Sequence, residues 1–533
     1  MGDAPLIVGV SGLRGIVGES LPPEVAVRYA GAFGGWLRDN PHYGREVVVA
    51  RDGRAGGETF YHAAISALLG CQIDVVSIGI ATTPTVGAYI THELHSAACG
   101  IIVTASHNPG EWNGLKILVG DRYELTQDMT PAQCHLAYSI SGARAPTANE
   151  AAEIIRRFES GDVGFQKNAG KTRSQSFTTT TDAIGRHCHM VWEAVIVRML
   201  HEYEDHDRAR PLDAYSTAFK DCKKWKVVLD SVNSSGAKAG EELIRSFHAE
   251  AIQLFGDGSG IFPHTPEPTA ENLSGEGGLC DAVPGLKADV GFAQDPDADR
   301  LAIVDENGRY IGEEYTLALC AESVLSWVDT APEGTPPRST GQPVLVANLS
   351  TSRMIDDVAA KYGGRVVRTP VGEANVVEVM KKLKAEGQNV VLGGEGNGGV
   401  IWPEVVYVRD SLGSMALVLS LMTRTGKTVS ELVAQSDSYS PGGSGYAIVK
   451  RKVAIASKAD AKPAVEKIAG HYDGHPDATI DLQDGVRVDF PEAGVWVHVR
   501  ASNTEPIMRL IAEAPTDEAA ESILAEVEGV IAG

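Results

Sequence analysis

Three aspartates stand close together after an apolar run near the middle of the chain. Asp295, Asp297 and Asp299 alternate within the stretch QDPDADRLAIVDE, directly after the run VGFA at 290–293. Carboxylates at this spacing repel one another if they converge, and a hard divalent cation with oxygen ligands relieves that repulsion. The pattern therefore predicts a Mg²⁺ site, with a solvated acidic turn as the plainer alternative.

A calcium-binding EF-hand loop is a second interpretation of the same stretch, because Glu306 falls at its twelfth position. Arg300, however, stands at the sixth position, where that loop needs a glycine for its turn. The residues that follow, LAIV at 301–304, have the composition of a strand rather than of a calcium loop. We therefore reject the EF-hand and keep the magnesium site.

A serine, a histidine and an amide end a second apolar run. In GIIVTASHNPGEWNGLK, the strand-like residues 101–103 stop shortly before Ser106, His107 and Asn108. The carboxyl ends of parallel strands are where open α/β sheets place their ligands. Ser106 therefore offers a hydroxyl with hydrogen-bond donors beside it, and Lys116 could return a cation to the same place. An N-cap serine on a turn is the alternative.

Two further loops have a composition suited to binding a polar ligand. LGGEGNGGVIWPE, at 392–404, combines glycines that let a ligand approach the backbone with Glu395 and Asn397, which can bond hydroxyls. VRASNTEP, at 499–506, has the composition of a phosphate-binding turn. Taken singly, a glycine-rich turn and an Asn-Thr β-turn explain these loops equally well. The candidate phosphate ligands are Arg500, Ser502, Asn503 and Thr504.

The composition excludes two classes of partner. The chain has 533 residues, with 47 Lys and Arg against 70 Asp and Glu, and a formal net charge of −23. Nucleic acids and anionic membranes need a basic surface, so we expect no nucleic-acid partner and no membrane partner. No stretch has the roughly 18 to 20 apolar residues of a membrane span. The seven cysteines form no Cys-x-x-Cys pair and fit reduced thiols, so we expect a cytoplasmic protein.

Strand-like and helix-like segments alternate along most of the chain, which indicates α/β units with parallel strands. The alternation restarts near residues 226 and 343, so we expect three such units. The C-terminal part instead alternates apolar and polar positions, which predicts an α+β unit with an antiparallel sheet. The expected boundaries are 1–140, a linker or insertion with a connecting helix at 141–225, then 226–335, 336–435 and 436–533.

Taken together, the four polar loops resemble those of the α-D-phosphohexomutases, the superfamily of phosphoglucomutase, phosphomannomutase and phosphoglucosamine mutase. TASHNP is similar to the family's phosphoserine loop, and DPDADR is similar to its metal loop. GEGNG resembles its sugar-selecting loop and RASNT its phosphate-binding loop, and the four occur in the family's order. The resemblance implies three mixed-sheet α/β domains of similar topology plus a C-terminal α+β domain, arranged around a central cleft.

For this chain the resemblance implies an intramolecular phosphotransferase. Ser106 would carry a phosphoryl group and, through one of its oxygens, would share a Mg²⁺ ion with the aspartates. The group would pass to a hexose phosphate, giving a hexose 1,6-bisphosphate that serves as intermediate and activator. The other phosphate would then return to the serine. The metal ligands would be Ser106, Asp295, Asp297 and Asp299.

Other side chains would share the work around the transferred group. Lys116 is expected to act as general acid or base, since a nearby metal and cations could lower its pKa. Glu395 and Asn397 would contact the sugar, and the loop from Arg500 to Thr504 would hold the phosphate at its far end. Three cationic side chains would neutralise charge at the transfer point, namely Arg14, His107 and Arg300.

Two departures from the family pattern bear on the substrate. Many members end the sugar loop with Ser-Gly-His, where this chain has Asn397, Gly398 and Gly399. Many also carry a basic residue in the third domain where this chain has Ala374. GEGNGGVIWPE and RASNTEP are closest to the phosphoglucosamine mutase branch, so we expect that activity, with phosphomannomutase or phosphoglucomutase as the alternative. A monomer and a homodimer both fit.

A metal-dependent sugar phosphatase is the alternative from a different class. The distant Arg500 loop argues against it, since that loop helps most when two phosphates are held at once. A nucleotide-dependent kinase is less consistent, because the chain has no Gly-x-x-x-x-Gly-Lys-Ser/Thr loop. A binding protein without activity would be expected to lack the serine or the aspartates, and all of them are present.

Overall fold

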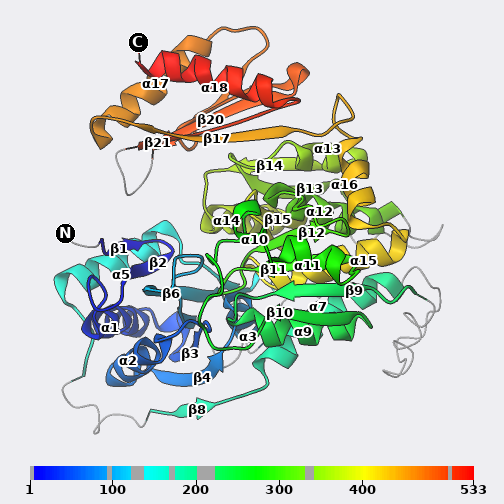
Figure 1. The fold of residues 1–533 in the computed structure, drawn as a ribbon. Helices are drawn as coiled ribbons and strands as arrows, with labels where there is room; N and C mark the ends of the chain where they lie inside the picture. The colour runs from blue at the N-terminus through cyan, green and yellow to red at the C-terminus, as the bar shows by residue number, and fades with distance from the viewer. Residues whose placement is uncertain are drawn as a thin grey trace.

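The structure is a computed structural model that describes residues 5–92, 99–121, 137, 139–166, 175–200, 222–329, 341–501 and 507–532. Four sheets organise these residues along the chain (Figure 1). Three of the sheets combine parallel with antiparallel strand pairs, and the fourth is antiparallel. This confirms the expected fold class of three mixed-sheet α/β units and a terminal α+β unit.

The first sheet is the largest of the four. Its described strands are β1 (Ile7–Gly9), β2 (Gly12–Ile16), β3 (Glu46–Arg51), β4 (Asp74–Ile80), β5 (Cys99–Val103), β6 (Trp112–Asp121), β7 (Gly142–Arg144) and β8 (Phe177–Thr179). The order is β1-β2-β6-β5-β3-β4-β8, with β7 beside β6. Two strands from the segment expected as a linker, β7 and β8, thus join this sheet. Among the described residues, this unit includes the helices α1 (Pro23–Asp39), α2 (Gly57–Gly70), α3 (Thr83–His92) and α5 (Ala148–Ser160), with a 3-10 turn, η1 (Pro41–Tyr43).

The second and third units each have a four-stranded sheet, and helix α7 (Ala183–Leu200) leads into the second. The second unit contains β9 (Lys226–Asp230), α9 (Gly236–Ser246), β10 (Glu250–Phe255), α10 (Ala270–Leu273), α11 (Leu279–Gly285), β11 (Val290–Gln294) and β12 (Leu301–Asp305). The third contains α12 (Glu313–Asp329), β13 (Pro343–Asn348), α13 (Met354–Lys361), β14 (Arg365–Thr369), α14 (Glu373–Ala385), β15 (Asn389–Glu395), β16 (Gly399–Ile401), α15 (Ser411–Thr425) and α16 (Val429–Asp437).

These three units share one strand order, which explains why the alternation in the sequence restarts. The orders are β4-β3-β5-β6, β10-β9-β11-β12 and β14-β13-β15-β16. Counted along the chain, the first strands of the three sets are β3, β9 and β13. Each of them lies between the second and the third strand of its set and runs parallel to both. The fourth strand pairs antiparallel with the third. A reversing turn therefore follows the third strand of every unit.

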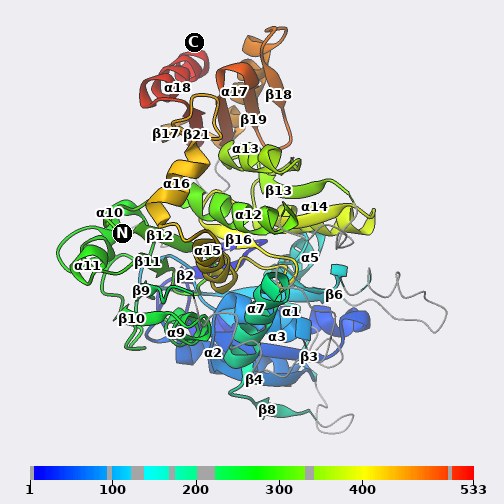
Figure 2. The same ribbon diagram turned by 90° about the vertical axis from the view of Figure 1, so that its right-hand side faces the viewer.

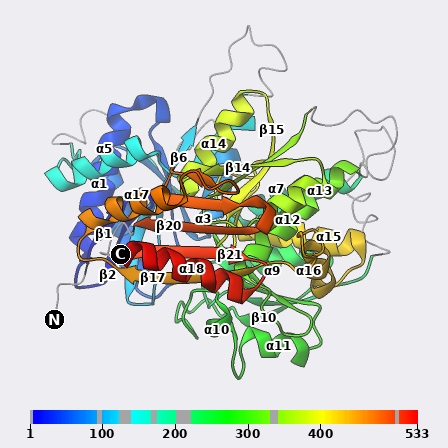
Figure 3. The same cartoon turned by 90° about the horizontal axis from the view of Figure 1, so that it is seen from above.

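The fourth unit is an antiparallel sheet with helices on one face. Its elements are β17 (Ala447–Ala454), η2 (Lys458–Asp460), α17 (Ala461–Tyr472), β18 (Thr479–Asp481), β19 (Val486–Phe490), η3 (Pro491–Ala493), β20 (Val495–Ala501), β21 (Ile507–Ala514) and α18 (Asp517–Ala532). The strand order is β17-β21-β20-β19-β18. Figures 1 and 2 show this unit above the third one, and Figures 1 and 3 show α17 and α18 on its outer side.

Each unit has a hydrophobic cluster of its own, and a further cluster joins the first three units. One cluster joins Ile90, Val195, Leu243 and Leu419, which lie on α3, α7, α9 and α15, helices that Figure 2 shows together. A separate cluster fills the fourth unit between its sheet and its two helices. Because a shared core resists displacement, the turns of the first three units are fixed relative to one another. None of the described helices is both long and apolar enough to cross a membrane.

Candidate active site

The predicted loops of the first three units occupy the same turn of the shared topology. Ser106 lies between β5 and β6, the aspartates lie between β11 and β12, and Glu395 ends β15 just before β16. Two contacts show that the three turns meet. The Ser106 Oγ donates to Asp295 Oδ2 at 3.0 Å, and Arg409 donates to both Asp299 and Glu395. The structure thus brings the serine and the acidic cluster together, as the sequence predicted.

Ser106 has an unusual backbone conformation at the end of β5. Its φ is +52°, in the left-handed region that few residues other than glycine adopt and that often marks a functional position. The residue is 1% exposed, and its Oγ also lies 3.4 Å from His107 Nδ1. The chain continues into strand β6 and not into a helix, so the N-cap interpretation is wrong.

A buried ion pair holds the backbone of Ser106. Arg54 donates through Nη2 to the Ser106 carbonyl oxygen (2.7 Å) and through Nε to Asp52 Oδ2 (3.0 Å). The Thr104 hydroxyl donates to the same Asp52 oxygen (2.7 Å) and accepts the Ser106 N–H (2.8 Å). Arg54 and Asp52 are buried. The planar arginine fork therefore fixes the turn that presents the hydroxyl.

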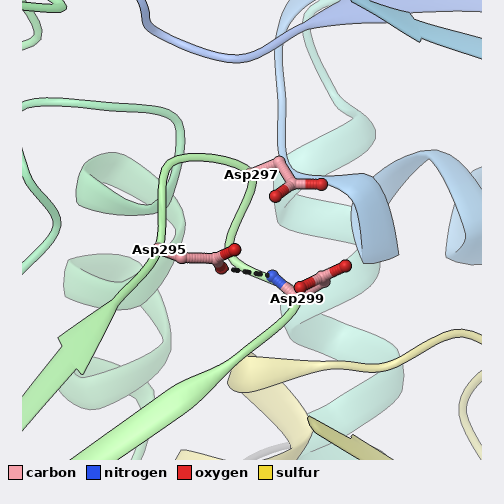
Figure 4. Close-up of side chains that lie close together, drawn as sticks. All are labelled: Asp295, Asp297 and Asp299. Atoms are coloured by element: carbon pink, nitrogen blue, oxygen red, sulfur yellow. Dashed lines mark hydrogen bonds between the residues drawn. The ribbon is translucent and has the colours of Figure 1, made fainter. Parts of the chain in front are cut away.

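The three aspartates lie on one buried turn (Figure 4). One carboxylate oxygen from each lies within 4.8 Å of the others. The backbone N–H groups of Asp299 and Arg300 donate to Asp295 Oδ1 at 3.0 and 3.1 Å. Ala298, with a φ of +54°, reverses the chain between Asp297 and Asp299. All three aspartates are 0% exposed, so the interpretation as a solvated acidic turn is wrong.

Side chains from other units hold the outer oxygens of two aspartates. Asp297 Oδ2 accepts from Thr83 Oγ1 and from Lys116 Nζ, each at 2.6 Å. Asp299 Oδ2 accepts from Lys116 Nζ at 2.9 Å and from Arg409 Nη2 at 2.6 Å. The other oxygen of each, Oδ1, is buried without a hydrogen-bond partner among the described residues. Two such oxygens beside a third carboxylate form the donor set of a hard divalent cation, so the residues fit a metal ion.

The same contacts separate the pKa values of the three carboxyls. Burial, together with the charges of Asp299 and Asp297, raises the pKa of Asp295 well above its usual value. Burial also acts on Asp299, but the cations of Arg409 and Lys116 outweigh it, and the pKa of this carboxyl lies well below the usual value. Burial and the charge of Asp299 would raise the pKa of Asp297, but the ammonium group of Lys116 outweighs them, so the pKa of this carboxyl also lies below its usual value. Ser106 is therefore bonded to the carboxyl that takes a proton most readily.

Lys116 on β6 is buried between two of these carboxylates. Burial alone would lower the pKa of the ammonium group, but Asp297 and Asp299 raise it above its ordinary value. The lowered pKa expected from the sequence is therefore wrong for this arrangement, because the nearest groups are anions. Held as an ammonium ion, Lys116 can donate a proton but cannot first accept one.

The three predicted cations surround the serine turn, but one of them is uncharged. Arg14 Nη1 donates to Asn108 Oδ1 at 3.2 Å. Arg300 Nη1 lies 3.8 Å from Glu267 Oε1, and the same oxygen lies 3.9 Å from His107 Nε2. Burial, together with the charges of Arg300 and Arg14, lowers the pKa of His107 to about 3. His107 is therefore neutral near pH 7 and offers a hydrogen bond rather than the expected positive charge.

Glu395 is fixed by donors from three segments. Its Oε1 accepts from Asn348 Nδ2 (2.9 Å) and from the Gly372 N–H (3.1 Å), while its Oε2 accepts from Arg409 Nη1 (2.8 Å). The residue is 4% exposed. A carboxylate can accept about four hydrogen bonds, so Glu395 keeps capacity for about one more.

Asn397 and Gly399 shape the turn that follows Glu395. The Asn397 Oδ1 accepts the Gly399 N–H at 3.1 Å, and the Asn397 side chain is half-buried. A Cβ placed on Gly399 would lie 2.3 Å from Cδ of Arg409. The aliphatic part of Arg409 thus fills the space that the imidazole of a Ser-Gly-His ending would enter.

Arg500 is the described member of the predicted phosphate loop. It lies on β20 and is half-buried. Burial lowers the pKa of its guanidinium, while the carboxylates of Asp484 and Glu395 oppose that lowering. Because Glu395 belongs to the third unit, its effect indicates that Arg500 lies near the turn between β15 and β16 that begins at Glu395, hereafter the sugar turn. The other predicted ligands, Ser502, Asn503 and Thr504, lie outside the described residues.

Sequence reasoning missed four residues that position the site, namely Asp52, Arg54, Thr83 and Arg409. Asp52 and Arg54 follow β3, and Thr83 follows β4, at the same edge of the first sheet as Ser106. Polar residues at the carboxyl ends of neighbouring parallel strands gather at one edge, and that rule could have found these three. Arg409 stands before helix α15 rather than at a strand end, so no such signal exists for it.

Models of one protein family match the chain in four segments. The models are described as Phosphoglucomutase/phosphomannomutase, alpha/beta/alpha domains I, II and III, and C-terminal domain. They match residues 5–135, 210–308, 313–439 and 449–530, respectively. All four domains of the family are therefore present and in order.

Two relatives match almost the whole chain. A Thermococcus kodakarensis protein named phosphoglucomutase/phosphomannomutase is 32% identical over 97% of this chain and 96% of its own length. A Methanopyrus kandleri protein named probable phosphoglucosamine mutase is 31% identical over 98% of this chain and 97% of its own length. Both alignments span all four units described above.

Solved structures share the fold at lower identity. A phosphoglucomutase/phosphomannomutase family protein from Burkholderia thailandensis aligns with a TM-score of 0.71 at 23% identity, over 98% of each chain. The N-acetylphosphoglucosamine mutase of Aspergillus fumigatus, in complex with GlcNAc-6P and magnesium, aligns with a TM-score of 0.52 at 14% identity, over 98% of this chain and 95% of that one. With the four family domains in order and relatives that match it almost from end to end, the chain belongs to the phosphoglucomutase/phosphomannomutase family of the α-D-phosphohexomutase superfamily and is a phosphohexomutase, an enzyme of the isomerase class.

Proposed function

We propose that this phosphohexomutase interconverts glucosamine 6-phosphate and glucosamine 1-phosphate through a phosphorylated Ser106 and a 1,6-bisphosphate intermediate. The observation that carries the proposal is the 3.0 Å contact between Ser106 Oγ and Asp295 Oδ2, which joins a hydroxyl to an acidic cluster in one buried site. The name of the Methanopyrus relative supports the substrate. The name of the Thermococcus relative favours a second candidate, phosphoglucomutase or phosphomannomutase activity.

The chemistry of the proposal is two phosphoryl transfers. In the first, the Oγ–P bond of phosphorylated Ser106 breaks and an O–P bond forms to the free hydroxyl of the bound sugar phosphate. Lys116 donates a proton to Oγ as it leaves and regains one from the attacking hydroxyl. In the second, after the bisphosphate has turned over, its other phosphate passes to Ser106 by the same bond changes in reverse. The enzyme ends phosphorylated, and the sugar phosphate has changed position.

The acidic cluster is the proposed Mg²⁺ site. Asp295, Asp297 and Asp299, with phosphorylated Ser106, would hold the ion, and the magnesium in the Aspergillus enzyme supports this choice. A bound magnesium ion supplies positive charge that stabilises the transferred phosphoryl group. The outer contacts from Thr83 and Lys116 would keep two of the carboxylates turned toward the ion.

The remaining residues bind and orient the sugar phosphate. Arg14 and Arg300 supply charge around the transferred group, and His107 supplies a hydrogen bond. Burial of Ser106 limits the access of water, which favours transfer to a sugar over hydrolysis. The sugar and the distal phosphate would be bound by Glu395, Asn397, Arg500, Ser502, Asn503 and Thr504.

A comparison of three substrates tests the proposal. The Mg²⁺-loaded enzyme, activated with glucose 1,6-bisphosphate, is assayed for isomer formation from glucosamine, glucose and mannose 6-phosphates, and inorganic phosphate is measured in parallel. We expect the highest kcat/KM for the glucosamine phosphate, with little phosphate released. A higher value for glucose or mannose phosphate establishes the second candidate. Inorganic phosphate as the main product contradicts mutase function and indicates a phosphatase.

A further inference from the structure

Arg409 lies where the aspartate turn of the second unit meets the sugar turn of the third. Its Nη2 donates to Asp299 Oδ2 at 2.6 Å, and its Nη1 donates to Glu395 Oε2 at 2.8 Å. Its Nε lies 3.3 Å from Glu373 Oε2. The side chains of the four residues are at most 13% exposed. One guanidinium therefore joins three buried carboxylates that belong to two different units.

The position of Arg409 depends on the absence of a side chain at Gly399. A Cβ at Gly399 would lie 2.3 Å from Cδ and 3.1 Å from Cγ of Arg409. Real Cβ contacts are not this short, so any other residue at this position would displace the arginine. Gly399 and Arg409 thus form one packing unit.

We propose that Arg409 is a positioning residue that couples metal binding at the aspartate turn to sugar binding at Glu395, and that Gly399 is required for this coupling. The inference rests on the proposed function. By bonding Asp299 Oδ2, Arg409 fixes the orientation of this carboxylate and leaves Oδ1, which has no hydrogen-bond partner among the described residues, available to a metal ion. By bonding Glu395 with the other arm of the same planar group, it relates the orientation of one carboxylate to that of the other.

The geometry of the guanidinium, and not only its charge, is essential to this coupling. Lys116 already places a positive charge on Asp299 Oδ2, so the charge balance there does not depend on Arg409 alone. An ammonium group has a single nitrogen on a flexible stem, and it cannot reproduce the two fixed arms of the fork. Arg409→Lys therefore keeps a cation at the site while it removes the bridge between Asp299 and Glu395.

Linkage gives the coupling a measurable form. If sugar binding and metal binding favour the same orientation of the fork, each ligand tightens the other by the same factor. Under the proposed mechanism the unphosphorylated enzyme does not turn over, so both affinities can be measured with it at equilibrium. Calorimetric titration with Mg²⁺, with and without saturating glucosamine 6-phosphate, yields this coupling factor for each variant.

The experiment compares the wild type with Arg409→Lys and Gly399→Ala. We expect Arg409→Lys to bind Mg²⁺ about 10- to 100-fold more weakly, the usual effect of removing an outer partner of a metal ligand. Its coupling factor should approach one, and its KM for the sugar phosphate should rise. Gly399→Ala should lower the Mg²⁺ affinity and the coupling factor in the same direction but by less, because it displaces the arginine without removing it.

Two substitutions of the same kinds serve as controls. Arg451→Lys changes an arginine that pairs with Glu521 and Glu528 at the surface of the fourth unit. Gly470→Ala adds a methyl group where no atom lies within 4 Å. Both should match the wild type in Mg²⁺ affinity and coupling factor. Thermal unfolding shows whether each variant is folded, and if Arg409→Lys is not, Gly399→Ala decides the question.

The outcomes separate this inference from the proposed function. A wild type that converts and binds none of the three hexose phosphates overturns the proposed function. A wild type that converts a hexose phosphate, beside an Arg409→Lys enzyme with the same Mg²⁺ affinity as the wild type, overturns only the inference. A weaker Mg²⁺ affinity with an unchanged coupling factor also overturns it, because Arg409 would then support the metal site without linking it to the sugar.

Discussion

The β5–β6 turn and the β15–β16 turn occupy the same place in the shared topology, but they hold their polar groups in different ways. In the first, Arg54 and Thr104 bond the backbone of Ser106, and within the described part of the chain the hydroxyl has polar contacts to Asp295 and His107. In the second, three donors bond the carboxylate of Glu395 itself. The proposed nucleophile is thus positioned mainly through its main chain, whereas the proposed sugar-binding carboxylate is positioned through its side chain.

This difference predicts how each turn fails. Substitutions that disturb the serine turn should lower kcat, because they misplace the reacting atom. Substitutions that disturb the Glu395 turn should mainly raise KM, because they weaken sugar binding in the ground state and the transition state alike.

The largest effect is expected for Ser106→Ala. Without the hydroxyl no phosphoenzyme can form, so kcat should fall by about 10⁴-fold or more, while glucosamine 6-phosphate binds about as in the wild type. Steady-state assays and calorimetry check the two parts. Ser457→Ala, at an exposed serine of the fourth unit, is the control and should be fully active. Wild-type turnover in Ser106→Ala would contradict the role of the serine turn.

Arg54→Lys should have the next largest effect. The substitution keeps a cation beside Asp52 but removes the arm that bonds the Ser106 carbonyl oxygen. A displacement of the hydroxyl by about 1 Å costs about 100-fold in rate, so kcat should fall by about 10- to 100-fold with KM little changed. Arg451→Lys is again the control. A raised KM with an unchanged kcat would show that this turn is not positioned through its backbone.

Glu395→Gln should show the opposite pattern. The substitution removes the charge-assisted bond from Arg409, which typically contributes about 1.5–3 kcal/mol. KM for the sugar phosphate should therefore rise by about tenfold or more, with a smaller change in kcat. Steady-state kinetics over a range of substrate concentrations separate the two constants. A fall confined to kcat would remove the contrast between the two turns.

The smallest effect is expected for the pH dependence of stability, through Glu314, whose carboxyl packs against the sugar turn. A Cβ on Gly396 would lie 2.1 Å from Glu314 Oε2, so this side chain supports the turn from below. Burial raises the pKa of Glu314 from 4.5 to about 8. Between these two pH values the unfolded chain carries the ionised group and the folded chain the protonated one. Stability contributed by the protonated group is therefore present at low pH and is lost as the pH rises toward 8.

Thermal unfolding between pH 5 and pH 8.5 checks this expectation. The Tm of the wild type should fall more steeply with rising pH than the Tm of Glu314→Gln, which cannot ionise. Glu466→Gln, at an exposed residue of α17, should follow the wild type. Parallel Tm curves for the wild type and Glu314→Gln would show that Glu314 has an ordinary pKa in the folded enzyme.

The sequence predicted what local patterns determine. Ser106 and the aspartates follow apolar strands directly, and the order of the four loops along the chain identified the family. The charge of His107 and the raised pKa of Lys116 could not be predicted, because they depend on side chains from other strands and units. Arg409 lies 110 residues from Asp299 along the chain, and only the fold brings the two together.

The proposed function depends above all on the passage of phosphate through the Ser106 hydroxyl. The most direct test is to treat the enzyme with glucose 1,6-bisphosphate and Mg²⁺, and then to locate and quantify bound phosphate by peptide mass spectrometry. We expect a single phosphate on Ser106 and a turnover rate that rises in proportion to its occupancy. An active enzyme with no phosphate on Ser106, or with its phosphate on another residue, would rule out phosphate transfer through this serine.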